Sequence, residues 1–527
     1  MMMNIETLNK IKTQALPQLF ARLESMPDKY VIENDKPKLA GEYFEKQTRI
    51  ALKNFDIINP AEVDEYIALG GYFPLAKVLE TEKREIIDTM IESNLRGRGG
   101  AGFPTGKKWE TAFGTESEQK YVVCNADEGD PGAFMDRSIL EGDPHCVLEG
   151  MAICGYAVGA NKGFIYVRAE YPKAVASLNH AIAQAKEKNL LGDNIMGTDF
   201  SFDVELRLGA GAFVCGEGTA LMESIEGRRG MPRNKAFRTT VKGLWDKPTV
   251  INNVETFANV PQIIANGANW FRSIGTEKSS GTKVFALVGK INKPGLVEVP
   301  MGMPIEKIVY DIGGGIPDGK AAKAVQTGGP SGGCIPAEMF DTCVDFESLK
   351  NIGSIMGSGG LVVMDEDDCM VDIAKFFLEF SVSESCGKCT PCRIGNKRLH
   401  ELLDKLTKGN GTMEDIAKLK ELSEVICETS LCGLGQSSPN PVLSTIRYFY
   451  DEYREHAADK SCRAHSCKSL LRYTITDACI GCTRCARGCP VSCISGTIKQ
   501  KHVIDQSKCI KCGECYSNCP VQAIEII

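Results

Sequence analysis

Cysteine is the residue type that most constrains this chain. There are 23 cysteines among 527 residues; none precedes Cys124, and the dense runs begin at Cys386. The polar N-terminus has no signal-peptide core, so clustered C-x-x-C spacings predict metal or iron–sulfur ligation rather than disulfides. The scattered cysteines stand in apolar surroundings and are predicted to be small core residues: Cys124, Cys146, Cys154, Cys215, Cys334, Cys343 and Cys369.

The C-terminal segment carries two copies of C-x-x-C-x-x-C-x-x-x-C-P. This run resembles that of bacterial two-cluster ferredoxins, in which the fourth cysteine of each copy ligates the other cluster. The resemblance predicts two [4Fe–4S] clusters, one held by Cys479, Cys482, Cys485 and Cys519 and the other by Cys509, Cys512, Cys515 and Cys489. Cys493 lies outside the pattern and is predicted to be unligated.

A third group of thiols lies further upstream, in E-S-C-G-K-C-T-P-C-R. Cys386, Cys389 and Cys392 are spaced to wrap three corners of a cubane cluster, so a fourth thiolate must come from elsewhere. Cys427 and Cys432 both compete for that place. A zinc knuckle is the alternative, but zinc sites usually pair two C-x-x-C units.

The segment H-A-A-D-K-S-C-R-A-H-S-C separates this group from the C-terminal run. Its soft and borderline ligands predict a structural zinc site with His456, Cys462 and Cys467 as ligands. The fourth ligand is His465 or a remote cysteine. A reduced linker with two spare thiols is an equally weighted alternative.

The stretch N-L-R-G-R-G-G-A-G-F-P-T-G-K-K-W, residues 94–109, predicts a ligand-binding loop. Its glycines let the backbone approach an anion closely, with N–H groups turned toward it. Basic side chains bracket the loop and favour a phosphate-bearing ligand: Arg96, Arg98, Lys107 and Lys108. A flexible linker would lack Phe103, Pro104 and Trp109. The loop matches neither of the two common nucleotide-binding motifs, G-x-G-x-x-G after a strand and G-x-x-x-x-G-K-[ST].

Strands alternate with helices after this loop, which predicts a doubly wound parallel sheet. The first strand, Lys120–Cys124, delivers the acidic turn N-A-D-E-G-D-P-G, and ligands bind at such strand ends in α/β sheets. A second glycine-rich turn, G-A-G-A-F-V-C-G-E-G-T at 209–219, opens a further helix.

These motifs, with I-N-N-V-E-T at 251–256, resemble those of the flavoprotein subunit of respiratory complex I. That family includes the beta subunits of NAD(P)-linked, electron-bifurcating hydrogenases and related soluble reductases. The resemblance runs from about Leu79 to Tyr453. It implies bound FMN and NAD(H) or NADP(H), and it favours Cys432 as the fourth cluster ligand.

The resemblance also assigns cofactor contacts by position. They are Gly97, Arg98, Gly99, Gly100, Ala101, Phe103, Lys108, Asn125, Asp127, Glu128, Asp130, Gly216, Glu217, Gly218, Lys235, Asn252, Asn253 and Thr256. Glu128, Asp130 and Glu217 are expected to position the cofactors rather than to act as acid or base. Asp130 stands where the family usually has Glu, and Gly218 replaces the second Glu of G-E-E-T. The loss of that carboxylate leaves NAD(H) and NADP(H) about equally favoured.

The predicted fold is α/β, with a Rossmann-like domain for FMN and NAD(P). We expect six segments: an N-terminal helical segment (1–85), the FMN/NAD(P) domain (86–275), a β-grasp domain (276–365), a four-helix bundle with one [4Fe–4S] cluster (366–455), a Cys/His hinge (456–475) and a two-cluster ferredoxin domain (476–527). Thr282–Gly289, Gly295–Pro300, Ile305–Ile312 and Ala324–Thr327 are the expected β-grasp elements.

The composition limits the partners. A net charge of −7 argues against nucleic acid, and no apolar run reaches the roughly 18 residues of a membrane helix, so the chain is expected in the cytoplasm. The resemblance implies an NAD(P)H oxidoreductase subunit of a soluble electron-bifurcating complex. Its expected partners are a small thioredoxin-like [2Fe–2S] subunit, ferredoxin, and an iron–sulfur catalytic subunit such as a hydrogenase, formate dehydrogenase or reductase. The alternatives are a non-bifurcating NADH dehydrogenase subunit and an electron-transfer scaffold without flavin activity.

Overall fold

Four parallel strands organise the first half of the chain. The structure, a computed structural model, describes residues 3–234 and 236–526. The strands lie in the order β5-β4-β3-β6: β3 (Tyr121–Ala126), β4 (Lys162–Arg168), β5 (Asp203–Gly209) and β6 (Thr249–Asn253). The interior of β4 is continuously buried, as in parallel sheets covered on both faces. This confirms the predicted α/β class and the parallel sheet.

Helices cover the sheet and fix its ligand-binding edge. α8 (Pro144–Val158) is buried along nearly its whole length and packs against α11 (Val254–Asn266) and β3. The other helices of this region are α5 (Lys83–Glu92), α6 (Thr105–Gly114), α7 (Met135–Gly142), α9 (Pro172–Glu187), α10 (Gly218–Ile225) and α12 (Ala268–Arg272). Because the strands are parallel, their carboxyl ends share one edge.

The N-terminal segment is not wholly helical. It contains α1 (Ile5–Glu24), α2 (Glu42–Glu45), α3 (Val63–Ala68) and α4 (Phe73–Leu79), together with a hairpin of β1 (Tyr30–Glu33) and β2 (Lys36–Leu39). The prediction of helices throughout residues 1–85 is therefore wrong. Asn34 and Asp35 both have positive φ, at 50° and 58°, which is the backbone of a two-residue hairpin turn.

A five-stranded sheet of order β10-β9-β11-β7-β8 follows. Its strands are β7 (Thr282–Gly289), β8 (Gly295–Pro300), β9 (Ala322–Thr327), β10 (Cys334–Pro336) and β11 (Gly360–Asp365), with α13 (Phe346–Asn351) beside them. Among the expected β-grasp elements, Ile305–Ile312 contains a π-helical turn over Lys307–Ile312. This domain has its own apolar core.

Four helices pack next in a bundle, α14 with α15 and α18, and α16 with α15 and α18. Their bounds are α14 (Met370–Ser383), α15 (Asn396–Thr407), α16 (Met413–Thr429) and α18 (Asn440–Tyr448), with short α17 (Gly433–Ser437) and α19 (Tyr450–Arg454).

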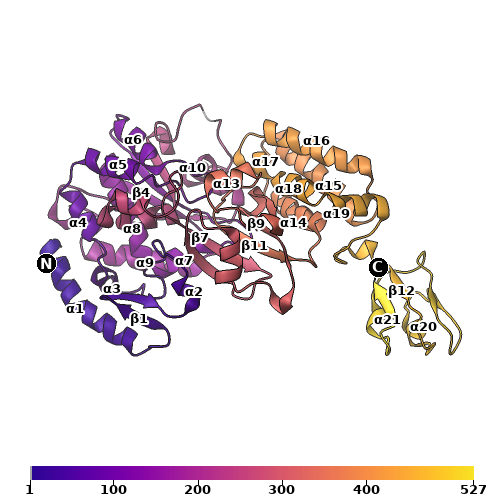
Figure 1. Cartoon of the computed structure of the whole chain (residues 1–527). Helices are drawn as coiled ribbons and strands as arrows, with labels where there is room; N and C mark the ends of the chain where they lie inside the picture. The colour runs from indigo at the N-terminus through magenta and orange to yellow at the C-terminus, as the bar shows by residue number, and fades with distance from the viewer. Residues whose placement is uncertain (1–2, 235, 527) are drawn as a thin grey trace.

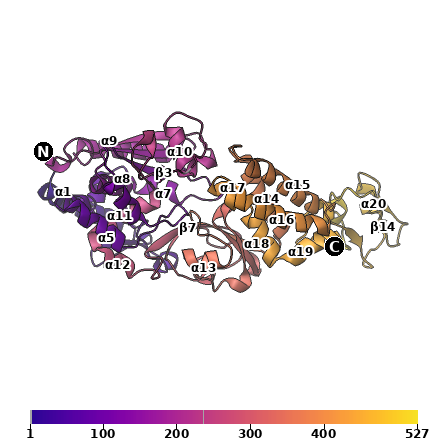
Figure 2. The same cartoon turned by 90° about the horizontal axis from the view of Figure 1, so that it is seen from above.

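The C-terminal arm, residues 473–526, stands apart from the rest of the molecule beyond the bundle (Figures 1 and 2). Its paired strands are β12 (Tyr473–Ile475) with β15 (Ile524–Ile526), and β13 (Ile494–Ser495) with β14 (Val503–Ile504). Two short helices complete it: α20 (Arg484–Gly488) and α21 (Glu514–Ser517).

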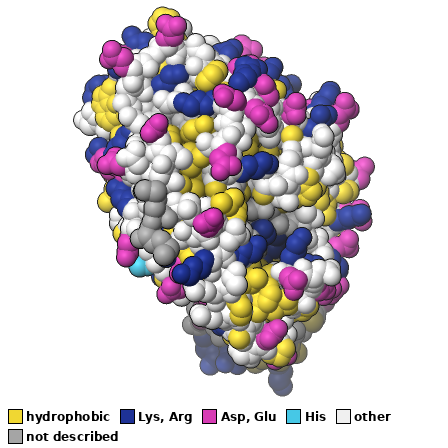
Figure 3. Space-filling view, turned by 90° about the vertical axis from the view of Figure 1, so that its left-hand side faces the viewer, with side chains coloured by type: hydrophobic (Ala, Val, Ile, Leu, Met, Phe, Trp, Pro, Cys, Tyr) yellow, Lys and Arg dark blue, Asp and Glu magenta, His cyan; other side chains and the backbone are white. Residues whose placement is uncertain are grey.

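The opposite end of the molecule, at the left of Figure 1, is seen face-on in Figure 3. Acidic and basic side chains are interspersed there with hydrophobic ones, so charge on this face is locally compensated. Among the described residues, no helix combines the length and the apolar character that crossing a membrane requires.

Candidate functional site

The carboxyl edge of the parallel sheet brings distant motifs together. β3 and β6 are neighbours, with Asn125 opposite Asn253, so the acidic turn after β3 lies beside the N-terminus of α11. The Asn125 amide donates a hydrogen bond to the Gly216 carbonyl at 2.8 Å. That bond ties the second glycine-rich turn to the first strand of the site. Three of the segments predicted to bind one ligand therefore converge.

The glycine-rich loop reaches the same edge. The backbone N–H of Arg98 donates to Thr256 Oγ1 at 2.9 Å, in the first turn of α11. A Cβ on Gly99 would stand 3.0 Å from the Asn253 Cβ, which is tighter than ordinary packing. A larger residue here would push the loop away from Asn253, so the glycine permits the close approach that the sequence predicts.

Two of the loop's basic side chains do not face the site. Arg98 is fully buried and donates to the Ser280 carbonyl at 2.7 Å, and burial lowers its pKa to about 10. Arg96 pairs with Glu347 and lies over the Phe346 ring. These two charges are therefore directed toward the β-grasp domain, and the cofactor contact assigned to Arg98 stays a prediction. The loop docks on the β-grasp domain, whose carbonyl and carboxylate groups take up the two guanidinium groups.

The outer part of the loop is more open. Phe103 is 41% exposed and Ala101 is exposed at the turn. Lys108 lies beneath them, with its Nζ 5.9 Å from the Phe103 ring centroid and 3.0 Å from the Ile251 carbonyl, to which it donates. Burial lowers the Lys108 pKa to about 8. Its hydrogen bond to Ile251 ties this cation to β6.

Asp127 is a buried carboxylate at the edge of the sheet whose hydrogen-bonding capacity is unused within the described part of the chain. It is 5% exposed, and neither carboxylate oxygen has a hydrogen-bond partner among the described residues. Burial raises its pKa to about 7, because nothing solvates the charged form. Its Oδ2 would stand 3.6 Å from a Cβ placed on Gly216. An unpaired acceptor beside the second glycine-rich turn fits a ligand rich in hydroxyl groups, as the ribityl chain of FMN is.

The neighbouring acids are held by backbone groups. Glu128 accepts from the N–H groups of Asp136 and Arg137 at 2.9 and 3.1 Å, in the first turn of α7, and burial raises its pKa to about 7. Glu217 accepts from the N–H groups of Thr219 and Ala220 at 2.9 and 3.0 Å and so caps α10. Both carboxylates brace the chain around the site.

Asp130 connects the site to the β-grasp domain. It accepts a short hydrogen bond from Ser358 Oγ, and a Cβ on Gly329 would stand 2.9 Å from its carboxyl carbon. Burial raises its pKa to about 6. The predicted contact residue Lys235 lies outside the described residues.

The thiols of the bundle gather beside this site. Cys386, Cys389, Cys392 and Cys432 line one small void, together with Val214 from the second glycine-rich turn and Pro232 from the segment after α10. Cys432 is 6% exposed at the start of α17, and the N–H groups of Leu434 and Gly435 favour its thiolate, opposing the rise in its pKa that burial causes. Cys427, the competing candidate, does not line the void.

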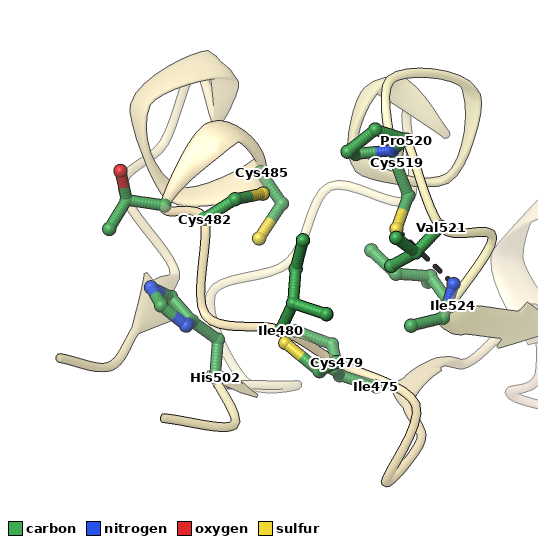
Figure 4. A pocket seen from close by; sticks show the side chains of 12 residues that line it. Ile475, Cys479, Ile480, Cys482, Cys485, His502, Cys519, Pro520, Val521 and Ile524 are labelled. Atoms are coloured by element: carbon green, nitrogen blue, oxygen red, sulfur yellow. Dashed lines mark hydrogen bonds between the residues drawn. The ribbon is translucent and has the colours of Figure 1, made fainter. Parts of the chain in front are cut away.

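The arm brings its eight predicted ligands together in two groups. One void is lined by Cys479, Cys482, Cys485 and Cys519 (Figure 4), and the other by Cys489, Cys509, Cys512 and Cys515. In each void three of the predicted ligands come from one run and the fourth comes from the other run, and Cys493 also lines the second void. This arrangement suits the crossed ligation expected of a two-cluster ferredoxin.

A further candidate metal-binding group lies where the arm joins the bundle. Its four ligand atoms all lie within 4.8 Å of one another and belong to Cys369, His456, Cys462 and Cys467. His456 Nδ1 lies 2.7 Å from the Glu452 carbonyl, which only accepts, so Nδ1 carries the proton. The unprotonated Nε2 faces the sulfurs of Cys369 and Cys467, at 3.3 and 3.4 Å. Three thiols and one imidazole form a donor set typical of structural zinc.

We expect zinc at this group, with Cys369 as a required ligand. Cys369→Ser should lower the zinc content of the purified chain from one per chain to near zero, because a hydroxyl is a far poorer zinc ligand than a thiolate. His465→Ala should retain the metal, since His465 is not part of the group. Elemental analysis measures both. Zinc retained in the serine variant and lost in the alanine variant would restore His465 as the fourth ligand.

Sequence reasoning missed two sets of residues. Cys369 is among the predicted core cysteines; it directly precedes α14 and is 87 residues from His456, so no local spacing marks it as a ligand. Lys283 and Glu255 form a fully buried ion pair between the β-grasp domain and α11. Glu255 follows Asn253 in I-N-N-V-E-T, yet only the domain contact reveals its partner.

Four family models match the chain. They are described as Nuo51 FMN-binding domain (residues 90–262), SLBB domain (284–335), NADH-ubiquinone oxidoreductase-F iron-sulfur binding region (372–456) and 4Fe-4S binding domain (502–525). Along the chain, these models match the α/β domain, the β-grasp domain, the helical bundle and part of the arm.

Curated relatives and a solved structure agree with these matches. The NADP-reducing hydrogenase subunit HndC of Solidesulfovibrio fructosivorans is 61% identical over 87% of this chain and 93% of its own length. An NADH-quinone oxidoreductase subunit of Rhizobium meliloti (strain 1021) is 43% identical over 79% of this chain and 99% of its own. A crystal structure of an NAD+-reducing [NiFe]-hydrogenase in the H2-reduced state superposes with a TM-score of 0.69 at 33% identity, covering 78% of this chain and 67% of that one.

The predicted family is therefore confirmed. The identities extend over most of the chain and of the relatives, and the matched ranges contain the sheet edge and the bundle thiols. The chain belongs to the complex I 51 kDa-type FMN-binding flavoprotein subunits, the NAD(P)-linked iron–sulfur oxidoreductase subunits found in hydrogenases and in NADH-quinone oxidoreductases.

Proposed function

We propose that this chain is the nicotinamide-reacting subunit of an electron-bifurcating complex. In that role it exchanges hydride with NAD(P)(H) at FMN and single electrons with ferredoxin and a partner catalytic subunit. The observation that carries the proposal is the continuity of the sites: the turn beside Asp127 also walls the void of the bundle cysteines. Bound FMN would supply the redox chemistry, because flavins exchange electrons both in pairs and singly.

The residues of the chain hold and orient the reactants. Asp127 would accept hydrogen bonds from ribityl hydroxyls, and the loop's N–H groups would face the phosphate. The second glycine-rich turn is fixed against the bundle, because Phe213 N–H donates to Glu384 at 2.9 Å and its ring lies 5.1 Å from that of Phe380. This contact holds the turn next to the bundle, so a flavin bound at the turn would have a short route for electrons to the bundle thiols.

The choice of nucleotide depends on charge near the N-terminus of α10. Gly218, the first residue of that helix, stands where a family carboxylate would repel a 2′-phosphate. Four arginines nearby are candidates to bind that phosphate. Arg228 and Arg233 form ion pairs with Glu223 and Glu226, whereas Arg229 and Arg238 are exposed to solvent. We therefore propose that NADP(H) is accepted, and NAD(H) with it.

Gly218→Glu should shift preference toward NADH. A Cβ at this position meets only Ile251, at 3.4 Å, and the backbone is ordinary, so the side chain fits. A carboxylate near the 2′-phosphate should lower the kcat/KM ratio of NADPH to NADH by about tenfold, or about 1.4 kcal/mol. Gly218→Gln, similar in size but neutral, is the control. An equal shift in both variants would assign the effect to bulk, and no shift would remove residue 218 from nucleotide selection.

The arm is the proposed outlet toward ferredoxin. From residue 459 to 527 there are ten Lys or Arg against five Asp or Glu, an excess that can steer an acidic redox partner. The Cys/His group would anchor the root of the arm, since two ligands come from the bundle side and two from the linker. Such an anchor leaves the arm as a separate body that approaches and leaves its redox partners.

The proposed partners are a thioredoxin-like [2Fe–2S] subunit, ferredoxin and an iron–sulfur catalytic subunit, within a cytoplasmic complex. A hydrogenase is favoured for the last, because relatives of this chain are named as hydrogenase subunits. The native complex tests the proposal: ferredoxin and NAD(P)⁺ should be consumed or produced together. Full turnover with the nucleotide alone would refute bifurcation and leave a linear electron path.

A further inference from the structure

The two halves of the arm are related by an internal repeat that differs at one chemically important position. Each fourth cysteine opens a matching segment, C-P-V-S-C-I at residues 489–494 and C-P-V-Q-A-I at 519–524. Both segments leave the cluster voids and enter short strands, β13 and β15. Cys493 therefore occupies the place that Ala523 occupies in the other half.

The two fourth cysteines have different hydrogen-bond surroundings. Among the described residues, Cys519 Sγ accepts one hydrogen bond, from the Ala523 N–H at 3.2 Å, drawn as the dashed line in Figure 4. Cys489 Sγ accepts the equivalent bond from the Cys493 N–H at 3.4 Å, and the Cys493 sulfur also lies 3.4 Å from it. A second donor group thus stands beside one cluster ligand and is missing beside its counterpart.

The direction of this sulfur–sulfur bond follows from ligation. A cysteine that holds a cluster is a thiolate and can only accept, so Cys493, which is outside the ligand set, supplies the S–H. Cys493 is 5% exposed and lines the same void as Cys489, Cys509 and Cys512, so water does not compete for the bond. Packing does not require the sulfur, because Ala523 fills the equivalent place with a methyl group and is 1% exposed.

We propose that Cys493 is a positioning residue that tunes one cluster of the arm. By donating its S–H to Cys489 it raises the reduction potential of the cluster at Cys489, Cys509, Cys512 and Cys515 above that of its twin. A hydrogen bond to a ligating sulfur disperses negative charge and so favours the reduced cluster. The inference rests on the two-cluster ferredoxin arm of the proposed function.

The asymmetry gives the arm a direction. Lys511, in the loop between Cys509 and Cys512, donates to the Ser469 carbonyl in the segment that joins the arm to the bundle, whereas α20, which follows Cys482, lies farther out (Figures 1 and 2). The cluster with the additional donor is therefore the one nearer the junction. The step between the two clusters is therefore downhill for electrons that ferredoxin delivers inward and uphill for electrons that leave toward ferredoxin.

Reciprocal substitutions in the full-length chain test the inference. Cys493→Ala copies the Ala523 half, and Ala523→Cys copies the Cys493 half. Cys493→Ser keeps a donor and serves as the conservative variant. Iron is counted after anaerobic reconstitution, and the midpoint potential of each cluster is then measured by a redox titration followed by electron paramagnetic resonance.

We expect Cys493→Ala to lower one cluster potential and narrow the gap between the twins, with iron content and FMN unchanged. Cys493→Ser should retain most of the gap, and Ala523→Cys should raise the potential of the other cluster. Unchanged potentials in Cys493→Ala with full iron would overturn the inference while leaving the two-cluster arm intact. Loss of about four irons in that variant would overturn it too, because Cys493 would then be a ligand. A wild-type arm without two clusters would refute the proposed function itself.

Discussion

Cys432→Ala should remove one cluster and abolish electron transfer from the flavin to ferredoxin, while the flavin stays bound. Cys432 is the thiol that closes the void around Cys386, Cys389 and Cys392, and it comes from a separate helix start. Three thiolates alone hold a cubane cluster poorly, so iron should fall from about twelve to about eight per chain. NAD(P)H should still bleach the flavin, because Asp127 and the glycine-rich loop are untouched, whereas electron transfer to ferredoxin should fall to background.

Cys427→Ala is the matched control for that substitution. Cys427 lies on α16 only five residues earlier, is partly exposed, and does not line the void. Its removal should leave iron content and ferredoxin reduction at wild-type levels. The reverse result, with iron lost from the Cys427 variant and kept in the Cys432 variant, would exchange the roles of the two cysteines.

Deleting residues 476–527 should abolish coupling to ferredoxin in the whole complex and spare reduction of the flavin by NAD(P)H. The deletion removes both groups of arm thiols but keeps the Cys369, His456, Cys462 and Cys467 group. The arm makes its main connection to the rest through the linker, so the sheet and the bundle should fold unchanged. Rates of nucleotide and ferredoxin turnover in the intact and shortened complexes provide the measurement.

A full-length variant separates loss of clusters from loss of a docking surface. Cys482→Ala keeps the basic surface of the arm and removes one ligand of its outer void. It should bind ferredoxin as the wild type does but pass fewer electrons to it. If the shortened complex couples ferredoxin to the nucleotide at the wild-type rate, the arm is not the outlet.

The sequence predicted best where ligands are close together in the chain. The cysteine runs dictate which three thiols share a void, because their spacing sets one turn of backbone around a cluster. The parallel sheet is equally predictable from the sequence, because buried strands and helices alternate along the chain, as in β3, α8 and β4. The carboxyl-edge position of Asn125 and Asp127 follows from that alternation.

The sequence is least informative about contacts between parts that are distant along the chain. The glycine-rich loop favours a phosphate beside its basic side chains, but the docking of the β-grasp domain buries Arg98 against Ser280. The local sequence of Cys369 predicts a core residue, because its partners lie 87 or more residues away. The hairpin at residues 30–39 was missed although Asn34-Asp35 is a turn pair, because its strands are only four residues long and largely exposed. Local sequence patterns do not predict which distant segments contact each other in the folded chain.

The proposed function requires one chain to carry electrons from a nicotinamide nucleotide to iron–sulfur clusters through a flavin held at the Asp127 edge of the sheet. Anaerobic addition of NADH or NADPH to the reconstituted full-length chain tests it most directly, with flavin absorbance and cluster paramagnetic resonance followed together. We predict that the flavin bleaches and that signals of reduced clusters appear in the same sample. A flavin that neither nucleotide reduces, or a bleached flavin with clusters that stay oxidised, would contradict the account.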